Sequence, residues 1–105
     1  MYEIIYNISY SVPVNLAKDW QAWMLEQHIP EIMSTNCFTN YQWVKLLDMD
    51  ETEAYTFAIQ FYAANNQYLQ KYLQEYAPLL RKKAGDKWGN AIVGFRTTMQ
   101  VIAKG

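Results

Sequence analysis

The first twelve residues alternate between apolar and polar side chains, and this pattern constrains the fold more than any other feature of the chain. The apolar positions are Tyr2, Ile4, Tyr6, Ile8, Tyr10 and Val12, and the polar positions between them are Glu3, Asn7, Ser9 and Ser11, with Ile5 as the exception. A period of two over this length is typical of a β-strand with one apolar and one polar face. The pattern therefore predicts a sheet whose apolar face is covered by helices.

The same alternation returns near the other end of the chain. Its apolar positions are Val93, Phe95, Met99 and Val101, and its polar positions are Gly94, Arg96, Thr98 and Gln100. We expect this apolar set to face the helices as well. Arg96 would then lie on the uncovered face of the sheet, together with Asn7 and Gln60.

Between these two strands, the spacing of apolar residues predicts a helix, two strands and a second helix. The expected elements are a strand at 2–12, a helix at 16–28, strands at 37–49 and 54–62, a helix at 66–76 and a strand at 91–103. The order β-α-β-β-α-β is the ferredoxin-like arrangement, an α+β fold in which both helices cover one face of a four-stranded antiparallel sheet. A chain of 105 residues suits one domain, which we expect to span residues 1–105.

The first predicted helix has an apolar stripe that ends close to a proline. Trp20, Trp23, Met24 and His28 lie along this stripe. Pro30 disfavours helical geometry at the residue before it. We therefore expect the helix to stop or kink there, or a short second helical turn to begin at Pro30.

Composition and charge argue against several classes of protein. Nine basic and ten acidic residues give a net charge of −1 without a basic stripe, which disfavours nucleic-acid binding. No apolar stretch approaches the roughly 20 residues that span a bilayer, and the N-terminus shows no signal peptide. The single cysteine, Cys37, fits a reducing compartment. We therefore expect a cytoplasmic protein without nucleic-acid or membrane partners.

The aromatic content of 16%, with nine Tyr and four Trp, is typical of interfaces and of aromatic-lined cavities. The predicted uncovered face mixes apolar and polar side chains, so two such sheets packed face to face would enclose a partly wet interior. We expect a homodimer formed by sheet-to-sheet packing, the arrangement known as a dimeric α+β barrel. The alternative is a monomer with an ordinary solvated face.

Several short motifs resemble a known family. They are His28-Ile29-Pro30-Glu31, Cys37-Phe38-Thr39, Tyr76-Ala77-Pro78 and Phe95-Arg96-Thr97, with Trp20 ahead of them. Together they resemble a small bacterial family known only as a domain of unknown function, which is related to the dimeric α+β barrel proteins. The resemblance implies the fold and the dimer, and it supplies no reaction.

Two further resemblances concern individual residues of barrel proteins. The H-x-P formed by His28 and Pro30 looks like the one in ethyl-tert-butyl-ether-degradation-type proteins and some polyketide cyclases. Asn7 resembles an asparagine on the first strand of haem-degrading barrels. Those proteins hold haem with a histidine in the later helix, and this chain has none there. We therefore expect no cofactor.

His28 and Arg96 are the main candidates for chemistry. His28 is the only histidine, and histidine titrates near neutrality, so it could act as a general acid or base. The alternative is a helix-end residue that packs at the edge of the core. Arg96 could hold a carboxylate or phenolate ligand in a cavity, or it could form an ion pair with Glu3 on the adjacent strand.

The other polar and aromatic candidates also have structural alternatives. Asn7 and Gln60 could supply hydrogen bonds to a ligand or simply hold interior water. Trp23 and Tyr41 could line an aromatic pocket for a flat ligand, or they could belong to the core. Arg81 and the two lysines after it are expected to be solvated. One histidine and one cysteine cannot form a standard zinc site, so no metal is expected.

Three functions remain open. The first is a homodimer that binds a small aromatic or anionic molecule, either in the barrel or between the helices and the sheet. The second is a cofactor-free monooxygenase, cyclase or isomerase, with His28 as its acid or base and Arg96 stabilising an oxyanion. The third is a structural dimer without a ligand. A pocket with an apolar floor that joins His28 to Arg96 would favour the second. A shallow or absent pocket, with Arg96 paired to Glu3, would favour the third.

Overall fold

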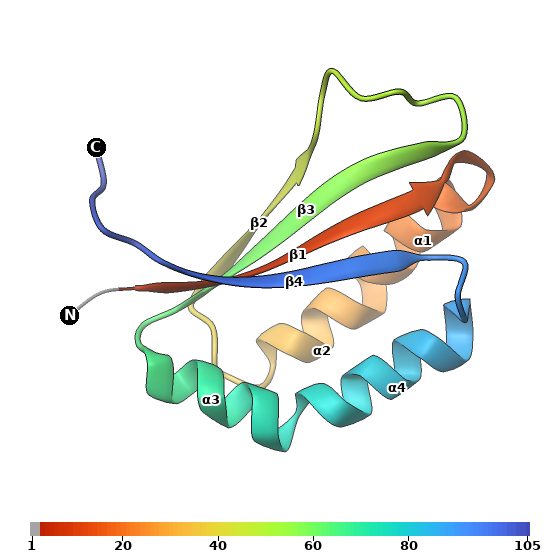
Figure 1. Ribbon diagram of the computed structural model, residues 1–105. Coiled ribbons are helices and arrows are strands. Elements are labelled where there is room, and N and C mark those ends of the chain that lie inside the picture. Colours follow the sequence, from red (N-terminus) through yellow and green to blue (C-terminus); the bar gives the residue numbers. More distant parts are fainter. Residues whose placement is uncertain (1–2) are drawn as a thin grey trace.

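The computed structural model describes residues 3–105, which form a four-stranded sheet and a layer of helices (Figure 1). Tyr2, the predicted start of the first strand, lies outside the described residues. In chain order the elements are β1 (Ile4–Pro13), the 3₁₀ turn η1 (Val14–Leu16), α1 (Ala17–Trp23), the π-helical segment η2 (Met24–His28), α2 (Ile29–Met33), β2 (Asn40–Lys45), β3 (Ala54–Ala63), α3 (Asn66–Glu75), α4 (Ala77–Trp88) and β4 (Val93–Gln100). None of the helices within residues 3–105 is long and apolar enough to cross a membrane.

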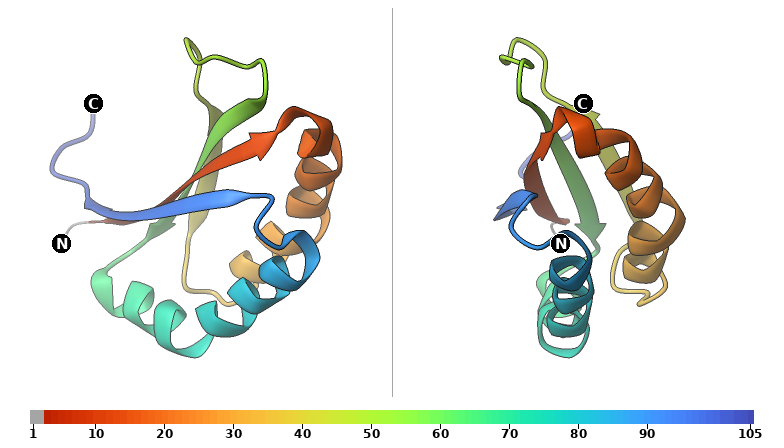
Figure 2. Two further views of the ribbon diagram at one scale, coloured as in Figure 1. Left: turned by 45° about the vertical axis from the view of Figure 1, so that its right-hand side comes forward. Right: turned by 90° about the vertical axis from the view of Figure 1, so that its right-hand side faces the viewer.

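The sheet has the strand order β2-β3-β1-β4, and all neighbouring strands run antiparallel. The helices gather on one face of this sheet and leave the other face uncovered (Figure 1, Figure 2). The arrangement confirms the predicted α+β, ferredoxin-like fold. Because β1 is paired on both sides, by β3 and by β4, its side chains stand at the centre of both faces.

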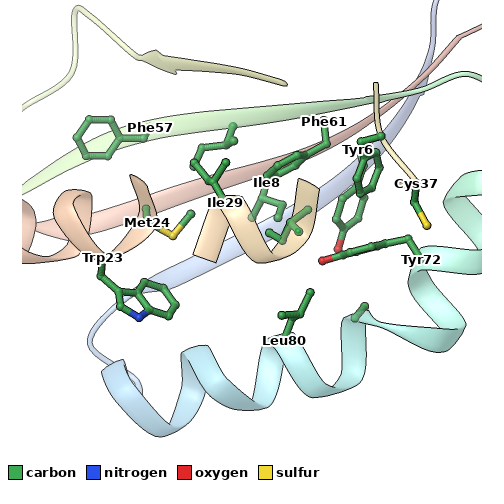
Figure 3. Packing of buried hydrophobic residues seen from close by; sticks show 14 of the residues in the cluster. Tyr6, Ile8, Trp23, Met24, Ile29, Cys37, Phe57, Phe61, Tyr72 and Leu80 are labelled. Carbon is green, nitrogen blue, oxygen red and sulfur yellow. The ribbon is translucent and has the colours of Figure 1, made fainter. Parts of the chain in front are cut away.

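The core lies between the helices and the even-numbered side chains of β1. Tyr6, Ile8 and Val12 are at most 3% exposed, and their β3 neighbours Ile59 and Phe61 are fully buried. Several of these side chains pack together between the sheet and the helices in Figure 3. Each large apolar side chain that becomes fully buried contributes roughly 1.5–3 kcal/mol to stability. The apolar residues of the first strand therefore point into the core, and the polar residues between them lie on the uncovered face.

The prediction for the last strand is wrong about which of its faces the helices cover. The register pairs Arg96 with Ile8 and Gly94 with Tyr10, and directly paired residues share a face of the sheet. Arg96 therefore faces the helices, and Phe95 lies on the uncovered face, 70% exposed. Gly94 is suited to the covered face because a Cβ atom there would come within 3.3 Å of the Tyr10 ring. Alternation shows that the two faces of a strand differ, but it does not show which face the helices cover.

The helical segment from α1 to α2 runs through Pro30 without a break. The N–H of Ile29 bonds to the carbonyl of Met24, five residues earlier, which is the hydrogen bond of a π-helix. In a regular α-helix the Pro30 ring would clash with the carbonyl of Glu26, and the wider turn relieves this clash. The predicted stop at Pro30 is not found, because the short helix α2 begins at Ile29 and has Pro30 in its first turn.

Candidate functional site

A cavity of about 200 Å³ lies between the helices and the sheet. Its floor comes from β1 and β4, and its walls come mainly from α1, η2 and α4. Six of its lining side chains are aromatic rings of Tyr or Trp: Tyr6, Tyr10, Trp20, Trp23, Tyr72 and Trp88. No Asp or Glu is among the described residues that line it. In Figure 3 the side chains of Tyr6, Trp23 and Tyr72 occupy the layer between the sheet and α3 and α4.

Two arginines from different elements meet at one phenol oxygen in this cavity. Arg81 of α4 donates from Nη2 to Tyr6 Oη at 2.9 Å, and Arg96 of β4 donates from Nε to the same oxygen at 3.1 Å. Tyr6 itself is only 3% exposed. Neither guanidinium forms an ion pair with a carboxylate within residues 3–105. The cavity therefore carries positive charge that no acidic side chain of its lining neutralises.

His28 is the last residue of η2 and reaches the same cavity. Its imidazole is 7% exposed and stacks on Trp23, with ring centroids 4.6 Å apart and an angle of 18° between the planes. Burial lowers the pKa of His28 from 6.5 to about 4, and the positive charges of Arg96 and Lys83 oppose the raising effect of Glu31. At neutral pH the imidazole is therefore uncharged and can accept a proton or a hydrogen bond.

Two further tyrosines in the cavity are held as neutral phenols. Burial raises the pKa of the Tyr10 and Tyr72 hydroxyls well above their ordinary value. The Tyr72 ring lies with its centroid 5.7 Å from that of Tyr6, and both hydroxyl ends reach the space beneath the sheet (Figure 3). Hydrogen-bonding groups thus lie among the aromatic side chains of the cavity.

The structure brings three of the predicted site residues together in this cavity: His28, Arg96 and Trp23. Arg96 reaches it from the helix-covered face, which corrects its predicted position on the uncovered face. The predicted alternative for Arg96 was an ion pair with Glu3. Glu3 pairs instead with Lys104 at 2.7 Å, and Arg96 bonds to Tyr6.

Three other predicted residues lie elsewhere. Asn7 and Gln60 face each other across β1 and β3 on the uncovered face, as predicted, so the sheet separates them from the cavity. Asn7 donates to the Ser9 hydroxyl at 3.2 Å, and Gln60 accepts from the Tyr62 hydroxyl at 3.3 Å. Tyr41 of β2 is not part of the cavity lining.

The sequence interpretation missed Arg81, Tyr6 and Trp88 as cavity residues. Arg81 was expected to be solvated with its neighbouring lysines, and it is exposed, but its side chain also bonds to Tyr6. A signal was present, because Ala77, Arg81, Ala84 and Trp88 recur at helical spacing on one side of α4. No group of three His, Cys, Asp or Glu residues able to hold a metal occurs within residues 3–105.

Residues 3–102 match the sequence family described as a domain of unknown function, DUF4286. No curated protein sequence matches the chain.

Solved structures share the fold with little sequence identity. A proposed antibiotic biosynthesis monooxygenase from Bacillus cereus has a TM-score of 0.71 at 8% identity, covering 100% of this chain and 98% of the other. SnoaB, a cofactor-independent oxygenase from Streptomyces nogalater, has a TM-score of 0.70 at 9% identity, covering 97% and 95%. A dimeric ferredoxin-like protein from an uncultured marine organism has a TM-score of 0.64 at 8% identity, covering both chains completely. Identities this low establish the fold alone.

We expect the buried neutral His28 to make the protein less stable in mild acid. Its pKa is about 4 in the folded protein against 6.5 ordinarily, so between these values the unfolded chain binds a proton that the folded protein does not. The contribution of the neutral His28 side chain to the free energy of unfolding is therefore complete above pH 6.5. It is lost as the pH falls to about 4. The loss is on the order of 3 kcal/mol.

The measurement is urea unfolding of the wild-type protein and of His28→Gln from neutral pH down to about pH 4. The charged groups that act on the imidazole, Glu31, Lys83 and Arg96, are present in both proteins, as are the surface carboxylates. The difference between the two curves therefore isolates the imidazole. Curves that stay parallel over this range would show that His28 is not held in its neutral form.

Proposed function

The chain belongs to the DUF4286 family, whose description assigns no function, and we propose that it is a homodimer that binds a small aromatic or anionic molecule between its helices and its sheet. One observation carries the proposal. Arg81 and Arg96 meet at the Tyr6 hydroxyl inside an aromatic cavity whose described lining has no carboxylate. Two cationic groups gathered at one hydroxyl, with no carboxylate beside them in the described lining, favour the binding of an anion.

The walls and the volume of the cavity limit the size and shape of this ligand. Trp23, Trp88 and the uncharged His28 offer flat surfaces on which a planar ring can pack. An apolar cavity of ~150 Å³ is enough to bind benzene. A cavity of about 200 Å³ therefore fits one aromatic ring with a small substituent.

The test uses three single-ring probes, phenol, benzamide and benzoate, with nitrogen–proton spectra of the indole side chains. Trp20, Trp23 and Trp88 line the cavity, whereas Trp43 does not. We expect at least one probe to shift the three lining indole signals in a saturable way and to shift the Trp43 signal less, because Trp43 meets the cavity only through its contact with the Trp20 ring.

A variant that fills the cavity should abolish this response. Ala84 lines the cavity from α4, so Ala84→Leu would occupy part of its volume. Ala22 is exposed on α1 and outside the lining, so Ala22→Leu adds the same atoms where no ligand is expected. Saturable binding that survives in Ala84→Leu, or the absence of any binding in the wild-type protein, would contradict the proposed site.

The side chains on the uncovered face of the sheet support the proposal of a homodimer. Its central cross-strand row is polar, with Gln42, Gln60, Asn7 and Thr97 side by side. Apolar side chains flank this row, and among them Phe95 is 70% exposed. Exposed apolar patches rimmed by polar groups are typical of interaction sites. We propose that a second copy covers this face by sheet-to-sheet packing, as the dimeric state of the ferredoxin-like structural neighbour also suggests.

We expect Phe95→Asp to convert the homodimer to a monomer. The substitution places a charge on β4 within the proposed contact, where it would have to be buried without a partner. Light scattering during size-exclusion chromatography should change from twice the chain mass to 12.4 kDa. Leu79→Asp is the matched control, since Leu79 is 59% exposed on α4 at the helical face. A wild-type protein that runs at 12.4 kDa would contradict the homodimer.

A second candidate function is favoured by one specific observation, which is that His28 and Arg96 share the cavity. The neutral imidazole could remove a proton from a bound substrate while Arg96 and Arg81 stabilise the oxyanion that forms. Chemistry of this kind suits a cofactor-free monooxygenase, cyclase or isomerase, and one structural neighbour is a cofactor-independent oxygenase. The test is His28→Ala assayed with phenolic substrates, where unchanged turnover would remove His28 from the reaction.

A further inference from the structure

We infer that Tyr6, Arg81 and Arg96 form a cradle for a carboxylate, and that the ligand is a single-ring aromatic carboxylate. The inference rests on the proposed ligand site between the helices and the sheet and narrows its ligand to one chemical class. It also assigns binding roles to Tyr6 and Arg81.

The Tyr6 hydroxyl accepts two hydrogen bonds but donates none to the described residues. A phenol oxygen can accept hydrogen bonds and can donate one of its own. Here the oxygen accepts from Arg81 and from Arg96, at 2.9 and 3.1 Å. Within residues 3–105 the Tyr6 hydroxyl makes no bond as a donor. Its proton therefore lacks an acceptor, and an anionic oxygen in the cavity would supply one.

The two guanidinium groups have N–H donors that the bonds to Tyr6 do not use. Each carries five N–H donors in a planar fork, and each uses one of its nitrogens on Tyr6. Neither has a carboxylate partner in the described part of the chain. The remaining donors match the two oxygens of a carboxylate, which arginine binds in pairs of parallel hydrogen bonds.

A carboxylate and a phenol differ in their charge at neutral pH, and this difference favours the carboxylate as the ligand. A carboxylate is ionised at neutral pH, whereas a simple phenol with a pKa of about 10 is not. The two arginine charges gain energy only from the ionised ligand. A neutral phenol or amide of the same size would fill the aromatic part of the cavity and leave both charges without a counterion.

The aromatic ring of the ligand can pack against the walls of the cavity. His28 stacks on Trp23, and Trp88 meets Trp23 edge to face with ring centroids 5.9 Å apart. The indole N–H of Trp88 is buried without a hydrogen-bond partner among residues 3–105, so this wall also lacks an acceptor. The volume of about 200 Å³ is enough for one ring, since an apolar cavity of ~150 Å³ already binds benzene.

The experiment compares the dissociation constants of benzoate, benzamide and 1-naphthoate by calorimetry and by the indole signals. Benzoate and benzamide have nearly the same shape and differ in charge, while 1-naphthoate keeps the charge and adds a ring. We expect benzoate to bind on the order of tenfold or more tightly than benzamide, as hydrogen bonds between charged groups suggest. We expect 1-naphthoate to bind more weakly than benzoate.

Three variants test the cradle itself. Arg81→Gln, Arg96→Gln and Tyr6→Phe should each reduce the preference for benzoate over benzamide, the arginine variants by roughly tenfold. Tyr6→Phe keeps the ring that packs on Phe38 and Tyr72 and removes only the hydroxyl.

Two control variants make the same chemical changes outside the cavity. Lys82→Gln removes an equal charge from the exposed side of α4, where Lys82 pairs with Asp86. Tyr76→Phe removes a hydroxyl from a tyrosine that does not line the cavity. Both should keep the full preference for benzoate. If Tyr6→Phe fails to fold, the two arginine variants decide the outcome, because both arginines are surface-accessible and lie outside the buried core.

The outcomes distinguish this inference from the proposed function. A wild-type protein that binds benzamide as tightly as benzoate would overturn the carboxylate cradle and leave the aromatic ligand site standing. A preference for benzoate that survives in all three variants would also overturn the cradle. Binding of none of the single-ring probes would overturn both the cradle and the proposed site.

Discussion

The bonds of Arg81 and Arg96 to the Tyr6 hydroxyl connect elements that are far apart in the sequence. Tyr6 stands in the central strand β1, Arg81 in α4 and Arg96 in the edge strand β4. Because both donors are charged but partly in water, each bond contributes roughly 1.5 kcal/mol or less to stability. Their larger effect is to fix the positions of the two guanidinium groups. Both cations are held beside a cavity whose other lining side chains are mostly aromatic and apolar.

The sheet divides the polar residues of this protein into two separate sets. Even-numbered side chains of β1 and β4 face the cavity, and odd-numbered ones face the proposed dimer partner. Asn7 and Gln60 therefore cannot contact a ligand held by Tyr6 and Arg96, although all four lie on adjacent strands. A ligand in the cavity and a partner on the uncovered face would contact opposite sides of the same backbone. Each could bind without displacing the other.

The sequence predicted the fold well because local periodicity and the order of elements nearly determine it. It predicted the site only in part, for two physical reasons. Alternation cannot tell which face of β4 is covered, and the answer depends on the register that places Arg96 opposite Ile8. A charge on a helix is also normally solvated, so the helical spacing that places Arg81 beside Trp88 did not by itself indicate the bond to the Tyr6 hydroxyl. A pocket joining His28 to Arg96 was one of the possibilities that the sequence left open, although the sequence placed Arg96 on the wrong face of the strand.

Ligand binding and acid–base chemistry are physically connected in this cavity. A histidine with a pKa of about 4 is a weak base at neutral pH, and general bases work best when their pKa lies near the working pH. Burial is the main cause of that low value, and the positive charge of Arg96 adds to it. A bound carboxylate would neutralise this charge and bring a negative charge close to the imidazole, which raises the pKa of His28 toward its ordinary range. The occupied cavity would thus hold a stronger base than the empty one, so that an anionic ligand would itself prepare His28 for proton transfer.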